Sequence, residues 1–244
     1  MRFLLFLLSL VFFIFVGAFL YLSYLGFVPV VSTVLGTDKP KNLGIGYSEK
    51  EFRSYVIKAG TQIIEMTDPT DAAHSVRYEG KKDLTESFTQ EEISARLNYA
   101  RWRYMPVTNT QVKIHDDGTI EFSGTVLMDR LDGFIARVGM GRYSRADVEK
   151  GLSYIGLFKV NPPIYAKGKA SVTDNEASIS VENIQIGKFN VPLVTVHANE
   201  VVNAVAQTII SQVNGLNAQS VTFGNGKMNF TGTVPERMIV EFAK

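Results

Sequence analysis

The first 31 residues limit what this chain can fold into more than any other segment, because they are almost entirely apolar. After Arg2 the next charged residue is Asp38, and within residues 3–31 only Ser9 and Ser23 are clearly polar. About 20 apolar helical residues cross the hydrocarbon core of a bilayer. A secretory signal peptide has a shorter apolar core and a small-residue cleavage site, and no such site is apparent here. We therefore predict that residues 1–31 form an uncleaved transmembrane signal anchor.

A buried core helix is the alternative for this segment, but such a helix should carry polar residues along one face. Tyr21 and Tyr24 near its end suit the interface between membrane and water. Arg2 and the amino terminus favour a cytoplasmic N-terminus, whereas Lys39 and Lys41 pull weakly the other way. We expect a single-pass protein of the cell membrane whose C-terminal domain lies outside the cytoplasm.

The remainder of the chain has the composition of an ordinary folded domain. Net charge is +1 and Cys is absent, which excludes disulfides, thiolate zinc sites and a cysteine nucleophile. The balanced charge gives no reason to expect nucleic acid as a partner. Residues 32–44 contain Pro40 and two glycines, and we interpret them as a linker. Residues 45–244 are then long enough to bury a core of their own.

Two stretches of this domain resemble each other at an offset of 108 positions. Residues 111–126 contain TIEFSGTV after an Asp-Asp-Gly turn, and residues 219–234 contain KMNFTGTV after an Asn-Gly turn. Alternating apolar residues around such turns predict β-hairpins. The strand faces correspond only if the first hairpin has a loop one residue longer. The alternative is that two unrelated hairpins share the same turn chemistry.

Helix starts also recur, in YSEKEF and FTQEEI. Ser48 and Thr89 are predicted N-caps, each with a glutamate at N3 (Glu51 and Glu92), the pattern of a capping box. A third helix is expected from residue 198, with Asn199 as its cap. The recurring unit is therefore a helix followed by a hairpin.

Further strands complete the predicted sheet. Residues 162–192 are expected to form a hairpin around Asp174-Asn175 with a bulge near Glu182, and residues 74–86 one more strand. Residues 128–158 are glycine-rich and are interpreted as an excursion with helical pieces at 134–138 and 145–154. The expected class is α+β, with long antiparallel strands and helices on one face.

Motifs for catalysis are lacking. The three histidines fit no metal-binding spacing, and no nucleophile elbow, phosphate-binding loop or dinucleotide fingerprint occurs. The His115-Asp116-Asp117 cluster is interpreted as a hairpin turn rather than a metal site. We expect no catalytic residues, no metal and no cofactor. One cluster combines basic and aromatic residues, namely Arg96, Arg101, Trp102, Arg103 and Tyr104. It predicts either a surface near membrane headgroups or an amphipathic helix end with solvated arginines.

The segments SFTQEEISARLN, VKIHDDGTIEFSGTV and VNAVAQTIISQVNGLNAQSVTFGNGKMNFTGTVPE resemble YpmS-like and LmeA-like bacterial membrane-anchored proteins. These are similar to the TULIP superfamily of tubular lipid-binding domains. The resemblance covers about residues 88–236, and residues 128–158 depart from the pattern. It implies a long, curved antiparallel sheet wrapped around helices, with an apolar groove between them.

The resemblance and the apolar strand faces together predict a groove for acyl chains. Its expected lining is Val112, Ile114, Phe122, Ile179, Val181, Val205, Ile209, Phe223 and Phe230. The same residues would fill an ordinary core, which is the competing interpretation. We expect a non-catalytic domain that binds a phospholipid or similar amphiphile. The alternatives are a membrane-tethered scaffold of the cell envelope with a filled core, and an envelope hydrolase whose residues form no recognisable motif.

Overall fold

The computed structural model describes residues 2–25, 32, 36–68, 71–139, 161–194 and 197–243, with the side chains of residues 2–12 left out. Its helices are α1 (Arg2–Tyr24), α3 (Glu49–Ala59), the short 3-10 helix η1 (Ala72–His74), α4 (Gln90–Asn98), α5 (Met128–Val138) and α7 (Ala198–Gln212). Its strands are β1 (Gln62–Glu65), β2 (Val76–Glu79), β3 (Lys82–Thr89), β4 (Val107–Ile114), β5 (Thr119–Val126), β6 (Pro163–Thr173), β7 (Glu176–Ile186), β8 (Phe189–Asn190), β9 (Asn217–Gly224), β10 (Lys227–Val234) and β11 (Arg237–Val240).

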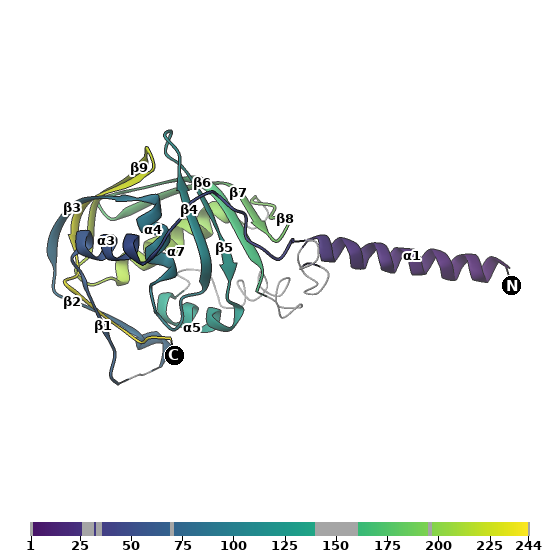
Figure 1. The fold of residues 1–244 in the computed structure, drawn as a ribbon, viewed down its shortest axis with the longest axis horizontal. Helices are drawn as coiled ribbons and strands as arrows, with labels where there is room; N and C mark the ends of the chain where they lie inside the picture. Colours follow the sequence, from purple (N-terminus) through teal and green to yellow (C-terminus); the bar gives the residue numbers. More distant parts are fainter. Residues whose placement is uncertain are drawn as a thin grey trace.

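The fold is α+β and is dominated by one strongly curled antiparallel sheet. The strand order is β3-β10-β9-β6-β5-β4, and β7 pairs with β6 and β8. Figure 1 shows this sheet curling as a half-barrel, with α4 and α7 in the middle of the molecule. A smaller sheet, β1-β11-β2, includes one parallel pair, β1 with β11. The curved sheet around helices agrees with the predicted architecture.

The two related hairpins are confirmed, and so is the difference between their loops. Val112 lies opposite Phe122 in the β4–β5 hairpin, and Val221 lies opposite Phe230 in the β9–β10 hairpin. The first strand of the second hairpin is thus one position nearer its turn. Both hairpins also change register beside the glycine of the shared Gly-Thr-Val segment, Gly124 or Gly232. The shared glycine therefore marks a β-bulge in each copy.

The third hairpin is confirmed as β6 and β7, and its bulge falls at Glu182, between the pairs Lys167–Asn183 and Gly168–Val181. The single strand predicted for residues 74–86 is wrong. Gly80, with a positive φ of 70°, separates β2 from β3, which belong to different sheets. The helical piece expected at 134–138 begins earlier, at Met128. The piece expected at 145–154 lies outside the described residues.

Polar side chains of α4 cover the free edge of β4. Backbone N–H groups of the strand donate to side-chain oxygens of the helix: Ile114 to Gln90 (3.0 Å), Val112 to Ser94 (2.9 Å) and Thr110 to Asn98 (2.9 Å). Four helical residues rise about 6 Å and two strand residues about 6.7 Å. Side chains four positions apart on the helix therefore lie opposite N–H groups two positions apart on the strand. The N–H groups at the edge of β4 are hydrogen-bonded without another strand.

The same device recurs at the outer edge of β7, where α7 supplies the side chains. The N–H groups donate as follows: Val181 to Asn199 (2.7 Å), Ile179 to Asn203 (2.8 Å) and Ala177 to Gln207 (3.2 Å). The N-cap of α7 is His197, which makes no side-chain capping bond, so the prediction of Asn199 as the cap is wrong. The side-chain oxygen of Asn199 instead accepts the hydrogen bond from the N–H of Val181 at the edge of β7.

The side chain of Glu121 attaches part of the predicted linker to the outside of the sheet. It accepts hydrogen bonds from Tyr165 (2.6 Å) and Lys41 (3.1 Å), and His115 Nε2 lies 2.8 Å from its other oxygen. Leu43, two residues after Lys41, is buried with Ile45 and Tyr165. Residues 41–45 therefore form a strap that packs against the sheet rather than a free linker.

Partial burial alone would raise the pKa of Glu121, but the bonds from Tyr165, His115 and Lys41 outweigh it and lower that pKa to about 2. A depressed carboxyl pKa stabilises the fold above the ordinary pKa of 4.5, and the contribution is lost as pH falls from there toward 2. The shift corresponds to about 3 kcal/mol. Glu121→Gln should lower the stability at pH 7 and flatten its pH dependence between about 4.5 and 2. Thermal unfolding followed by circular dichroism across this range checks both. An unchanged pH profile would show that the strap does not depend on this carboxylate.

α1 extends away from the rest of the molecule (Figure 1) and has exposed aromatic side chains, among them Phe13, Phe15 and Tyr21. Within the described part of the chain, no helix is both long and apolar enough to cross a membrane. The transmembrane assignment of residues 1–31 therefore stays a prediction.

Candidate ligand pocket

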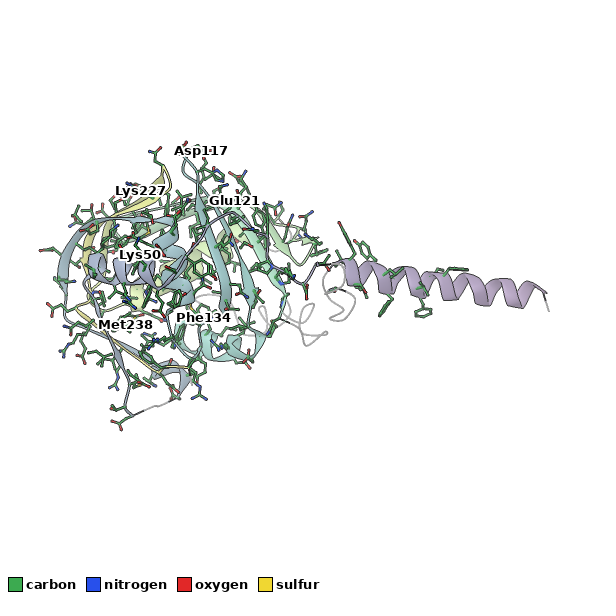
Figure 2. All side chains as sticks on the ribbon, viewed as in Figure 1. Lys50, Asp117, Glu121, Phe134, Lys227 and Met238 are labelled. Carbon is green, nitrogen blue, oxygen red and sulfur yellow. The ribbon has the colours of Figure 1, made fainter. Side chains whose placement is uncertain are left out.

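A cavity of about 340 Å³ lies where α3, α4, α5 and the end of α7 meet β2 and β11 of the smaller sheet. Its apolar lining includes Val76, Leu97, Trp102, Met105, Phe134, Val138, Ile209, Val213, Met238 and Val240. Figure 2 places Phe134 and Met238 at the opposite side of the body from the hairpin tips marked by Asp117 and Lys227. The volume lies near the lower end of the range for small-molecule sites.

Close packing at a glycine sets the position of α5. A Cβ on Gly133 would lie 1.9 Å from Cδ1 of Tyr104, so only glycine lets the helix approach this ring. Phe134 then contacts Trp102, with ring centroids 5.9 Å apart. The indole N–H of Trp102 donates to the hydroxyl of Ser75 (3.1 Å), which fixes the ring at the wall of the pocket.

Two arginines line this largely apolar cavity, Arg96 from α4 and Arg137 from α5. Arg137 Nη1 donates to Oε1 of Gln212 (2.9 Å), whereas its buried Nε has no hydrogen-bond partner among the described residues. Arg96 Nη2 lies 3.7 Å from the sulfur of Met238, a weak acceptor. Neither arginine forms a salt bridge with a described carboxylate.

Three other arginines of the domain have carboxylate partners. Arg103 binds Glu241 (2.5 Å) and Arg237 binds Glu79 (3.1 Å). Arg53 binds Glu49 on the same helix (3.1 Å). A guanidinium has five N–H donors and cannot lose its charge in a protein. Arg96 and Arg137 are half-buried, so the pocket holds positive charge and hydrogen-bond donors that water or a ligand, rather than a carboxylate of the described part of the chain, must satisfy.

The pKa of Tyr78 on β2 reflects both its burial and the positive charges of the two pocket arginines. Burial raises the pKa of its phenol, while the charges of Arg137 and Arg96 act against that increase. The Arg137 guanidinium lies 5.9 Å from the centre of the Tyr78 ring, and that of Arg96 lies 5.9 Å from the centre of the Tyr55 ring. The aromatic faces stabilise the two cations in part. The neutral phenol is an additional hydrogen-bond donor beside them.

No family model, curated protein or solved structure matches this chain.

The structure places the nine predicted groove residues at several different sites. Ile209, which is 40% exposed, lines the pocket, and the other eight do not. Phe230 is buried in a core cluster with Phe88 and Val221, and Phe223 packs against that cluster. Val112 and Ile114 are buried beside α4, whereas Phe122, Ile179, Val181 and Val205 are half-buried. A common groove lined by these residues stays a prediction.

The sequence pattern indicated some of the pocket residues and gave no sign of the others. Arg96 and Trp102 belong to the basic and aromatic cluster noted above, but Arg103 from the same cluster pairs with Glu241 outside the pocket. Arg137 and Tyr78 carry no signal in their own segments. Their proximity to Arg96 depends on how α5 and β2 pack. Within the described residues, no three His, Cys, Asp or Glu side chains are grouped so that they could hold a metal ion.

Proposed function

We propose that this protein is a membrane-anchored, non-catalytic domain that binds an amphiphile, with the cavity between α4, α5 and α7 as the binding site. The observation that carries the proposal is the cavity itself, whose walls combine about ten apolar side chains with two cationic ones. An acyl chain gains about 0.8 kcal/mol for each CH₂ that it buries. The half-barrel around α4 and α7 also supports the TULIP-like relationship inferred from the sequence.

Anchorage through α1 belongs to the same proposal. The helix has 23 residues, which corresponds to a length of about 35 Å. Phe13, Ile14 and Phe15 are each more than 60% exposed, and three successive residues cover most of a helix circumference. Such side chains favour an apolar surrounding on all sides. We propose that α1 resides in the cell membrane and that the remaining domain lies outside the cytoplasm.

Native mass spectrometry of the full chain, released from nonionic detergent, tests the proposed function. Wild-type protein should carry one amphiphile per chain. Ala100 lines the cavity and is 5% exposed, so Ala100→Phe should fill part of the cavity and remove the adduct. Ile57→Phe is the matched control, because Ile57 is 79% exposed on α3. In a detergent-free cell lysate, deletion of residues 1–25 should move the chain from the membrane pellet to the supernatant.

Two results would contradict this proposal. An adduct that persists in a folded Ala100→Phe variant would place the amphiphile elsewhere. A wild-type chain that stays free of lipid after exposure to membrane lipids would favour the alternative of an envelope scaffold. Circular dichroism melting of the variant separates a filled cavity from a failure to fold.

A further inference from the structure

The two pocket arginines differ from Arg103 and Arg237 in what surrounds them. Those two have carboxylate partners, whereas Arg96 and Arg137 face apolar walls, aromatic rings, one amide oxygen and one sulfur. Removing charge from water costs free energy unless an opposite charge or hydrogen bonds compensate it. An anion in the cavity would supply that compensation.

Acceptor geometry points to the type of anion. The buried Nε of Arg137 has no acceptor in the described part of the chain, while Nη1 of the same group donates to Gln212. A guanidinium binds a carboxylate or a phosphate through two parallel N–H groups. Gln212 is itself held, because its Nε2 donates to the carbonyl of Val138 (2.8 Å). Among the described residues, the Nε–H of Arg137 therefore has no acceptor, and because neighbouring atoms cover it, an anion would reach it only after a small local shift.

We propose that Arg96 and Arg137 together bind the anionic headgroup, a phosphate or a carboxylate, of a single-chain amphiphile whose chain lies against the apolar walls. This inference rests on the proposed amphiphile binding and adds charge selectivity to it. The cavity of about 340 Å³ suits one headgroup with part of one chain. The site selects anionic amphiphiles over zwitterionic ones of equal chain length.

The protein contains its own probe for this test. Trp102 is the single tryptophan of the chain and lines the cavity. Bromine atoms on an acyl chain quench indole fluorescence at short range. Full-length protein in phosphatidylcholine nanodiscs would be titrated with three brominated single-chain amphiphiles of equal length, which carry a phosphate monoester, a carboxylate or a phosphocholine. Quenching of Trp102 then measures occupancy of this cavity.

We expect the phosphate or the carboxylate probe to reach half-maximal quenching at a concentration at least tenfold below that of the phosphocholine probe. The tighter of the two identifies the headgroup. Arg96→Met and Arg137→Met preserve much of the side-chain volume and should each weaken the anionic probe about tenfold or more. They should change the phosphocholine probe less than about threefold. Arg77→Met is the matched control, because Arg77 is exposed and next to Tyr78 on β2.

The outcomes separate the two proposals. Equal quenching by all three probes would overturn charge selection and leave amphiphile binding intact. If none of the three probes quenches Trp102, both the charge selection and the amphiphile binding are overturned. If the arginine variants weaken every probe equally, the arginines only shape the cavity. A salt titration of the wild-type protein does not depend on the folding of any variant. Added salt should weaken the binding of the anionic probe and leave the binding of the phosphocholine probe unchanged. The opposite result contradicts the inference.

Discussion

Gly232→Ala should destabilise the domain by about 3 kcal/mol, the combined order of a strained backbone and an overpacked site. A Cβ at this position would lie 1.9 Å from the carbonyl oxygen of Asn217 and 3.1 Å from the amide nitrogen of Gln219. Both contacts are backbone atoms, so no side chain can move aside. The φ angle of 152° also lies in a region that other residues rarely adopt.

The repeated hairpin supplies a matched control for this change. Gly124 holds the corresponding place in the first hairpin, yet its added Cβ would lie 3.2 Å from Thr108 O and Thr110 Oγ1. Gly124→Ala should cost less than about 1 kcal/mol, because small shifts relieve these contacts and alanine restricts the unfolded chain. Thermal melting of both full-length variants in detergent tests the difference. Equal losses would show that the two bulges constrain the backbone alike.

Glu92→Ala should also cost about 3 kcal/mol, because one buried carboxylate joins α3, α4 and β3. Its oxygens accept hydrogen bonds from Ser54 (2.5 Å), Lys58 (2.8 Å) and the backbone N–H of Thr89 (2.9 Å). Burial would raise the pKa of Glu92, but the bonds from Lys58, Ser54 and Thr89 prevail and lower it. Alanine would leave the Thr89 N–H and the Lys58 charge without this partner.

Glu51 offers the comparison that isolates the buried network. It occupies the same N3 position on α3, but it is only half-buried and its side chain accepts a hydrogen bond from the hydroxyl of Ser48 (2.5 Å) rather than from a lysine of another element. Glu51→Ala should therefore change the melting temperature far less than Glu92→Ala. A Glu92→Gln variant keeps the volume and should lie between the two. If Glu51 and Glu92 proved equally important, helix capping rather than the buried ion pair would be the source of the stability.

Local chemistry was sufficient to predict several elements. Thr89 and Glu92 form the predicted capping box at the start of α4. At the start of α3, Ser48 is the predicted N-cap but accepts from the N–H of Lys50, and Glu51 binds the Ser48 hydroxyl, so the box predicted there is incomplete. The turns after Asp117 and at Asn225 produced the two related hairpins, and the phase change at Glu182 produced a bulge. In each case the deciding interactions lie within a few residues along the chain.

The pocket could not be predicted in this way. Arg96 and Arg103 are seven positions apart in one basic segment, but Glu241 neutralises only Arg103. That difference depends on where the C-terminal segment after β11 passes. Arg137 joins the pocket because Gly133 lets α5 pack against Tyr104. Neither contact leaves a trace in the periodicity of its own segment.

Hydropathy, capping residues and turn residues act over short distances, and they were enough to predict the apolar N-terminal helix, the starts of α3 and α4, and the hairpins. The tertiary structure alone decided which side chains became partners. Asn199 covers the edge of β7 and does not cap α7. Residues 41–45 are attached to the sheet through Glu121. Two arginines lie in a largely apolar cavity without carboxylates from the described residues. Such pairings depend on the packing of segments far apart in sequence, where burial and competition for charged partners set the outcome.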